Sequence, residues 1–147
     1  MIKSFGKLEE NEIIELEKKI KHRLPEDYRE FLRNNNGGTT DCELICFDTE
    51  NIKEGIALDV LYGINLSKSL CIEQWCEEYS TDLLEDMIII GHAVETGIIL
   101  LVNRDDWKGI YFWDNALDYE NSTEDKCMYK IADTFSEFLN GLYSCEE

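Results

Sequence analysis

The sequence predicts a single α+β domain, residues 1–147, in which helices cover a mainly antiparallel sheet. Three short runs of β-branched and aromatic residues, typical of strands, follow one another closely at Met87–Ile90, Ile98–Val102 and Ile110–Trp113. Elsewhere, apolar residues recur at spacings of three and four, which predicts helices with one buried face. A chain of 147 residues has the length of one domain and can bury a sizeable core. We therefore expect an N-terminal helix pair, a middle helix and a C-terminal helix, all packed on the sheet.

The N-terminal helix pair follows from one apolar pattern and two breaks. The pattern predicts a first helix over Glu9–His22, with acidic residues near its start and lysines near its end, as the helix dipole favours. Pro25 separates the helices, because the residue before a proline is pushed out of the α region and proline suits the first position of the next helix. The run Asn34–Gly38 ends the second helix, since asparagine and glycine tolerate the left-handed conformation at a helix end.

Two further strands and one helix are expected before the three strand-like runs. The strands fall at Glu43–Phe47 and Ile56–Tyr62, and the helix at about Ser69–Tyr79, where an apolar stripe is opposed by acidic residues. Glu95–Gly97 then supplies the turn between the first two of the three runs. These two runs lack polar alternation, so we expect that part of the sheet to be buried.

The C-terminal part predicts one last strand and one helix. Cys127–Ile131 has the composition of a short strand. Thr134 and Glu137 have the spacing of a capping box, in which each side chain bonds the backbone N–H of the other residue. The apolar residues that follow share one helical face, so this helix is expected to pack on the sheet.

The charge is strongly acidic and unevenly distributed. The chain has 32 acidic and 14 basic residues, a net charge of −18. Residues 1–33 hold eight of each sign, whereas residues 34–147 hold six basic and twenty-four acidic residues. Such a field repels nucleic acid and anionic membranes and attracts basic partners. The same excess also serves solubility alone, so charge by itself leaves both interpretations open.

The cysteines are expected to be free thiols in a cytoplasmic protein. The first ten residues contain no apolar run of signal-peptide length, and no segment approaches the ~18 apolar residues of a membrane span. Cys46, Cys71 and Cys76 interleave with apolar residues and are interpreted as small core residues. The pairs Cys42/Cys46 and Cys71/Cys76 lack the CxxC spacing of zinc sites, and both histidines lie far from them in sequence. We therefore expect no metal.

No catalytic constellation assembles from the sequence. The glycines form no phosphate-binding loop, and no residue near a cysteine or near His92 marks a nucleophile and its base. Carboxylates are too frequent for a catalytic pair to be chosen by spacing. The acidic stretch 114–125 fails as a calcium loop, because Ala116 stands at a ligand position and Tyr119 at the glycine position. We expect a binding module that is not an enzyme and needs no cofactor.

Several motifs occur in a fixed order along nearly the whole chain. They are Leu24–Leu32 followed by Asn36-Gly37-Gly38, then Ile89–Gly91, the glycine-led Gly97–Val102, Gly109–Asp114 and the ending Ile131–Leu139. Together they resemble the SUKH superfamily, the Smi/Knr-like domains best known as bacterial immunity proteins. The resemblance implies an α+β domain without an enzymatic role.

Two functions follow from this resemblance. Many bacterial members neutralise toxins of polymorphic or contact-dependent secretion systems, often nucleases, by binding them directly. Fungal relatives act in cell-wall and signalling regulation instead. We expect an immunity protein that binds a basic, nuclease-type toxin domain through an acidic surface, because a nuclease is basic where it holds phosphates. The alternative is a non-enzymatic regulatory scaffold or adaptor.

The candidate contact residues are acidic side chains in two segments, with one tyrosine as a candidate anchor. A solvated polar face is the competing interpretation for each of them. The expected partner is a cognate toxin domain and neither nucleic acid nor a membrane, and the protein itself is expected to be a monomer or weak homodimer. The residues are Glu73, Glu77, Glu78 and Asp82 in the middle of the chain, and Asp114, Asp118, Tyr119, Glu120, Glu124 and Asp125 in the later loop.

Overall fold

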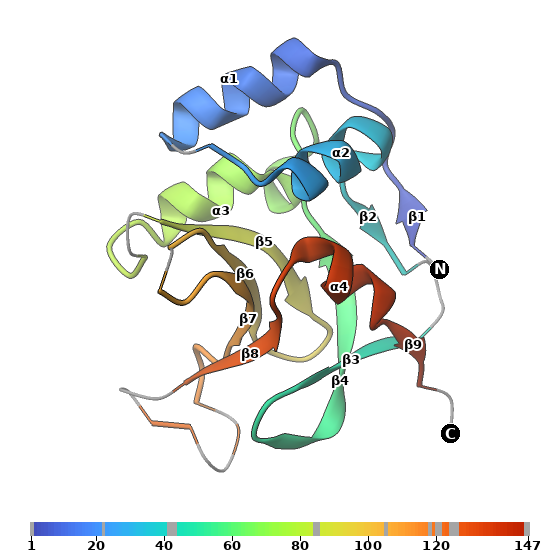
Figure 1. The fold of residues 1–147 in the computed structure, drawn as a ribbon, viewed down its shortest axis with the longest axis vertical. Coiled ribbons are helices and arrows are strands. Elements are labelled where there is room, and N and C mark those ends of the chain that lie inside the picture. The colour runs from blue at the N-terminus through green and yellow to red at the C-terminus, as the bar shows by residue number, and fades with distance from the viewer. Residues whose placement is uncertain are drawn as a thin grey trace.

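An antiparallel sheet forms the centre of the computed structural model and confirms the predicted α+β class (Figure 1). The structure describes residues 2–21, 23–40, 44–83, 86–104, 106–117, 119, 122–123 and 127–145. The main strand order is β1-β2-β4-β5-β6-β7-β8, and β3 pairs with both β4 and β9. The strands are β1 (Lys3–Ser4), β2 (Gly38–Thr39), β3 (Ile45–Thr49), β4 (Ile52–Leu61), β5 (Met87–Ala93), β6 (Ile98–Val102), β7 (Gly109–Trp113), β8 (Met128–Ala132) and β9 (Tyr143–Ser144).

The four predicted helices are all present. They are α1 (Glu10–Ile20), α2 (Glu26–Asn35), α3 (Ile72–Glu78) and α4 (Phe135–Asn140), with a short 3-10 turn before α3 at Lys68–Leu70. In Figure 1, α1, α2 and α3 gather at one end of the molecule, and α4 lies below α2. α3 packs on β5, whereas α4 packs on β7 and β8.

The predicted three-strand meander is confirmed and its first two strands are buried. β5, β6 and β7 pair antiparallel in sequence order, and every residue of β6 is buried. The register places His92 opposite Ile98 and Ile98 opposite Trp113. The predicted strand ended at Ile90, but β5 continues through His92 to Ala93. The histidine side chain is therefore held on one face of the sheet.

The end of α2 is fixed by two residues with left-handed backbone. Asn36 has φ +48° and Gly37 has φ +84°, and a Cβ on Gly37 would run into the backbone carbonyls of Leu61 and Tyr62. The Asn36 side chain is buried and makes two hydrogen bonds with the backbone of Ile64, donating at 2.9 Å and accepting at 2.8 Å. The asparagine–glycine stop predicted from the sequence thus also ties α2 to the segment after β4.

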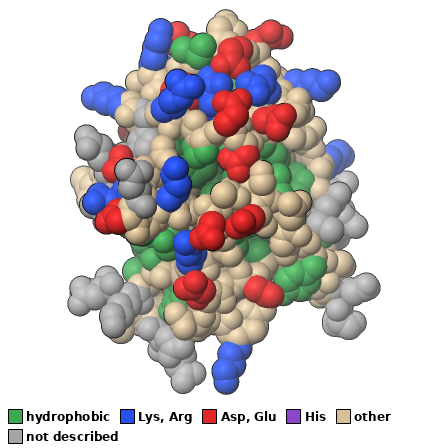
Figure 2. All heavy atoms as spheres, viewed as in Figure 1, with side chains coloured by type: hydrophobic (Ala, Val, Ile, Leu, Met, Phe, Trp, Pro, Cys, Tyr) green, Lys and Arg blue, Asp and Glu red, His purple; other side chains and the backbone are tan. Residues whose placement is uncertain are grey.

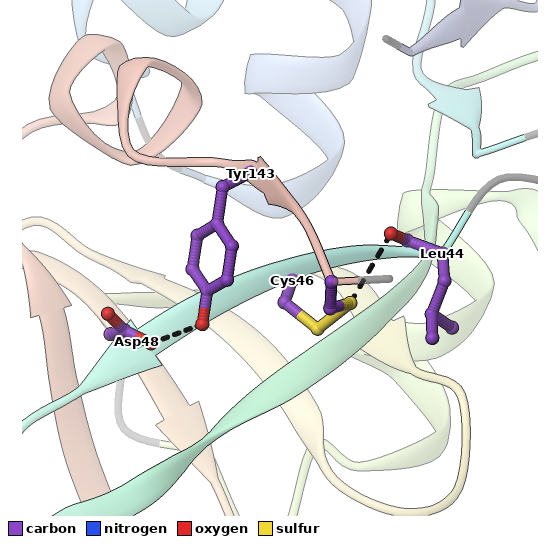
Figure 3. Close-up of a disulfide and its surroundings, with 5 residues drawn as sticks. Leu44, Cys46, Asp48 and Tyr143 are labelled. Atoms are coloured by element: carbon purple, nitrogen blue, oxygen red, sulfur yellow. Dashed lines mark hydrogen bonds between the residues drawn. A yellow bond between two sulfur atoms is a disulfide. The ribbon is translucent and has the colours of Figure 1, made fainter. Parts of the chain in front are cut away.

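A disulfide corrects the expectation that all cysteines are free thiols. Cys46 in β3 is bonded to Cys145 at the C-terminal end, 99 residues later, with 5.6 Å between the Cα atoms (Figure 3). Cys71, Cys76 and Cys127 are free thiols. Closing a loop of about 100 residues removes roughly 4 to 5 kcal/mol of chain entropy from the unfolded state in the simplest model.

The disulfide holds β9 against the edge of β3. Cys46 pairs with Tyr143 in the strand register, and the Tyr143 hydroxyl donates a hydrogen bond to Asp48 at 2.6 Å (Figure 3). Gly55 leaves space for this tyrosine, since any Cβ there would overlap its hydroxyl. The Cys145 sulfur lies 3.3 Å from the Leu44 carbonyl oxygen; this is a contact and not a hydrogen bond, because a disulfide sulfur carries no hydrogen.

Opening the disulfide should destabilise the fold and release β9. We expect Cys145→Ser to lower the free energy of unfolding by about 2–4 kcal/mol, because β9 makes only two register pairs and loses its covalent tether. Urea unfolding measures this, and the free, half-buried Cys127 supplies the control variant Cys127→Ser. Equal stability of the parent protein with and without a dithiol reductant would contradict the assignment.

A buried arginine of α2 forms ion pairs with two glutamates of α1. Arg29 is 7% exposed, and its guanidinium donates to Glu10 at 2.5 Å and to Glu17 at 3.0 Å. Glu17 also accepts the backbone N–H of Leu24 at 2.8 Å. The hydrogen bonds from Arg29 and Arg33 hold the pKa of Glu10 below its usual value. Two of the eight basic residues in the first 33 residues, Arg29 and Arg33, are therefore paired inside the helix pair.

The ion pairs of Arg29 with Glu10 and Glu17 should make stability pH-dependent. The pKa of Glu10 is lower in the folded state than its ordinary value of 4.5, so its stabilising contribution is present above that value and is lost as the pH falls through the folded pKa. We expect Arg29→Met to lower the free energy of unfolding at pH 7, with a difference from the parent protein that shrinks below about pH 4.5. Lys18→Met, which removes an exposed pair with Glu15, is the control. A difference independent of pH would contradict this account.

Candidate protein interface

The acidic residues expected on the middle helix lie on and just after α3. Glu77, Glu78 and Asp82 are exposed. Glu73 points elsewhere, because its carboxylate pairs with Lys19 of α1 at 3.1 Å. Three of the four predicted side chains in this segment therefore remain available at the surface, and the fourth connects α3 to α1.

The later acidic loop differs from the prediction at Asp114. Asp114 was expected at the contact surface, but it is 0% exposed. Its carboxylate accepts hydrogen bonds from the backbone N–H of Tyr119 at 2.9 Å and from the Ser122 hydroxyl at 2.6 Å. Since the Ser122 hydrogen is given to Asp114, the Tyr129 hydroxyl donates to the Ser122 oxygen at 2.6 Å. Asp114 therefore organises the base of the loop and cannot reach a partner.

The remaining predicted residues of this loop fall into two groups. Tyr119 is half-buried and packs edge-on against Phe112, with 5.7 Å between ring centres and 83° between ring planes. Its ring thus serves the core at least in part. The others, Asp118, Glu120, Glu124 and Asp125, lie outside the described residues.

Removing the Asp114 carboxylate should cost stability. We expect Asp114→Ala to lower the free energy of unfolding by roughly 1–3 kcal/mol, because the N–H of Tyr119 and the Ser122 hydroxyl lose a buried acceptor. Asp82→Ala removes an exposed carboxylate and should change stability by less than about 0.5 kcal/mol. Urea unfolding compares the two variants. Equal, small effects would show that Asp114 is exposed in solution.

A line of aromatic side chains runs from α3 across β7, which the sequence did not reveal. Trp75 and Tyr79 of α3 stack with 6.0 Å between ring centres, and Tyr79 meets Trp113 of β7 edge-on at 5.6 Å. Tyr111 lies two residues before Trp113 and so on the same face of the strand, and it meets Trp107 at 5.6 Å. We call these five half-buried residues the aromatic row. It contains all three tryptophans of the chain.

The base of the aromatic row is fixed by a hydrogen-bonded histidine. Tyr62 is fully buried and stacks on Trp75 with 5.1 Å between ring centres. Burial, followed by the charges of Asp59, Tyr79 and Glu78, raises the pKa of Tyr62, so its hydroxyl stays protonated and donates to Nδ1 of His92. Nε2 of His92 then donates to Asp59 at 2.8 Å. The histidine is thus a packing residue that holds Tyr62 beneath Trp75.

These groups do not assemble a catalytic or metal site. The Tyr62 hydroxyl is buried and protonated, which makes it a poor nucleophile. Burial also raises the pKa of the Cys76 thiol, so thiolate formation is disfavoured there. Within the described ranges, no group of three or more histidine, cysteine, aspartate or glutamate side chains is placed to hold a metal ion. The surface around the aromatic row therefore consists of aromatic rings beside carboxylates.

The sequence matches a known protein family over most of its length. The model of the SMI1 / KNR4 family (SUKH-1) matches residues 7–141. The chain therefore belongs to this family, and the resemblance noted in the sequence is confirmed. No curated protein matches the chain. The family is known for immunity proteins that bind cognate toxins and is generally a non-enzymatic fold. Among the described residues, no helix has the length and apolar character needed to cross a membrane.

Proposed function

We propose that this protein is an immunity protein that neutralises a basic, nuclease-type toxin domain of a polymorphic or contact-dependent secretion system by binding it directly. The observation that carries the proposal is the family match over residues 7–141, since members of this family bind cognate toxins. A non-enzymatic mechanism agrees with a surface that offers aromatic rings and carboxylates in place of an activated nucleophile.

The charge distribution supports a basic partner. Residues 34–147 carry the whole net charge of −18, and the exposed acids Glu77, Glu78 and Asp82 lie beside the aromatic row. Figure 2 shows most lysine and arginine side chains at the end of the molecule where α1 and α2 lie, intermixed there with acidic side chains, while acidic and hydrophobic side chains are more frequent than basic ones below. A nuclease is basic where it holds phosphates, so an acidic protein can occupy that surface and exclude the substrate.

The cytoplasm is the proposed place of action, because a nuclease toxin meets its nucleic acid substrate there. The Cys46–Cys145 disulfide is the feature that a reducing compartment would open. The interface proposed here does not include β9 or β3. Toxin binding should therefore proceed with the disulfide open or closed, provided that the domain stays folded.

Reversing charge beside the aromatic row should slow toxin binding. We expect the double variant Glu77→Lys/Glu78→Lys to reduce the association rate with a basic toxin domain about tenfold at low salt, with less effect at high salt. The measurement is surface plasmon resonance with an inactivated toxin C-terminal domain encoded beside this gene, at two salt concentrations.

A matched control separates local from global charge. Glu15→Lys/Glu30→Lys changes the net charge by the same amount, but these exposed residues lie on α1 and α2. Equal slowing by both double variants would mean that only the net charge of the protein affects the association rate. The contact would then lie away from the aromatic row. Absence of any complex with neighbouring toxins would overturn the immunity role and favour the regulatory scaffold.

A further inference from the structure

Two side chains of the aromatic row use their polar atoms within the protein. The Trp75 indole N–H donates to the Ser69 carbonyl at 2.9 Å, and the Tyr111 hydroxyl donates to the Trp107 carbonyl at 3.0 Å. These two side chains therefore offer ring surface, not hydrogen bonds, to a partner. Half-buried tryptophan and tyrosine lose little conformational entropy on binding, and they dominate the energetics of many protein interfaces.

One end of the aromatic row already holds a guanidinium group. The Cζ atom of Arg104 lies 5.8 Å from the centre of the Trp107 ring, within the range of a cation–π contact. The same guanidinium approaches the carboxylates of Asp86 at 4.0 Å and Asp106 at 3.6 Å. At this end, an aromatic ring and two carboxylates thus surround one arginine of the chain itself.

The α3 end of the aromatic row repeats the ring and carboxylate arrangement. Tyr79 and Trp113 meet at 76°, which forms a corner of two rings. Glu78 directly precedes Tyr79, and the Asp82 backbone N–H bonds the Tyr79 carbonyl at 2.9 Å, which keeps Asp82 near this corner. In the part of the chain that the structure describes, no lysine or arginine makes a cation–π contact with either ring. The corner therefore combines two rings with acidic residues close by in the chain, and among the described residues no arginine stacks on it.

Asp59 adds a third carboxylate near the same end. His92 connects Asp59 to the row, since its Nε2 bonds that carboxylate at 2.8 Å and its ring centre lies 5.8 Å from that of Trp75. The Asp59 side chain is 47% exposed, so it remains accessible to a partner while the histidine fixes its position. Aromatic rings flanked by exposed carboxylates form the chemical environment that favours a cation over a neutral group.

We propose that the corner of Tyr79 and Trp113, together with Trp75 that stacks on Tyr79, is the docking site for arginine side chains of a protein partner. This inference rests on the proposed function and names the chemistry that the toxin must present. Arginine fits better than lysine, because its guanidinium is planar, weakly hydrated and able to stack on a ring while it bonds a carboxylate. A compact ammonium ion keeps its hydration and gains less from the rings.

Charge excludes two other occupants of this surface. A nucleic acid could stack its bases on the rings, but its phosphates would face Glu78, Asp82 and Asp59. A second copy of this chain would bring the same acidic corner against itself if the two corners met across a two-fold axis. An arginine-bearing protein surface satisfies both the rings and the carboxylates.

Peptide titration of the full chain tests the arginine preference directly. The probes are nona-arginine and nona-lysine, which have the same charge, and the readout is the indole N–H signals of the three tryptophans in a ¹H–¹⁵N spectrum. We expect nona-arginine to shift the Trp75 and Trp113 signals at roughly tenfold lower concentration than nona-lysine. The Trp107 signal should shift less, because Arg104 already covers that ring.

Two variants localise the site. Tyr79→Leu keeps an apolar side chain in the corner but removes one ring, and it should weaken nona-arginine binding about five- to tenfold. Trp107→Leu, at the occupied end, should leave the affinity within about twofold. Circular dichroism establishes that each variant folds. The titration of the parent protein remains decisive if Tyr79→Leu does not fold.

Three results would overturn the inference. They are equal affinity for the two peptides, signal shifts confined to Trp107, and displacement of nona-arginine by an uncharged apolar peptide of the same length. Failure here is separable from failure of the immunity role. A toxin complex that Tyr79→Leu leaves unchanged retains the immunity role and rejects the arginine site. Arginine-selective binding without any toxin complex retains the arginine site and rejects the immunity role.

Discussion

The rest of the structure depends on the buried antiparallel pairing of β5, β6 and β7. Because successive residues of a strand face opposite sides, a strand that is buried throughout requires cover on both faces. The two faces of β7 have different surroundings. Phe112 is fully buried and packs on Phe47, which in turn packs on Phe138 of α4. Trp113, the next residue, faces the other side and meets Tyr79 of α3. One face is therefore the core, and the other carries the aromatic row.

The elements with strong local signals were predictable from the sequence. The meander, the four helices and the α2 stop each depend on apolar periodicity, glycine or proline within a few residues, so the sequence contains most of their determinants. The strands β1, β2 and β9 have two residues each, which is too short to show any alternation. They exist because neighbouring strands in the fold offer free edges, and edge positions are set by topology.

Contacts that residue spacing does not reveal explain the other differences. Cys46 and Cys145 are 99 residues apart, and nothing in the spacing of six cysteines selects this pair. Asp114 resembled any other residue of an acidic loop, and only the positions of Ser122 and Tyr119 show that it is a buried acceptor. The aromatic row combines residues from α3, the loop before β7 and β7 itself. The sequence predicted the helix that ends near Tyr79 and the strand that ends at Trp113, but it could not show that the two elements meet.

In the proposed complex, α3 and β7 face the toxin, so that charge and ring surface act in one interface. Hydrogen–deuterium exchange of the protein alone and in complex with a cognate toxin domain tests this most directly, because backbone amides report the contact without any substitution. Protection is expected in residues 72–82 and 107–113, with little change in α1 and α2. Protection concentrated in α1 and α2, or along β3 and β9, would contradict the claim and move the interface to another face of the sheet.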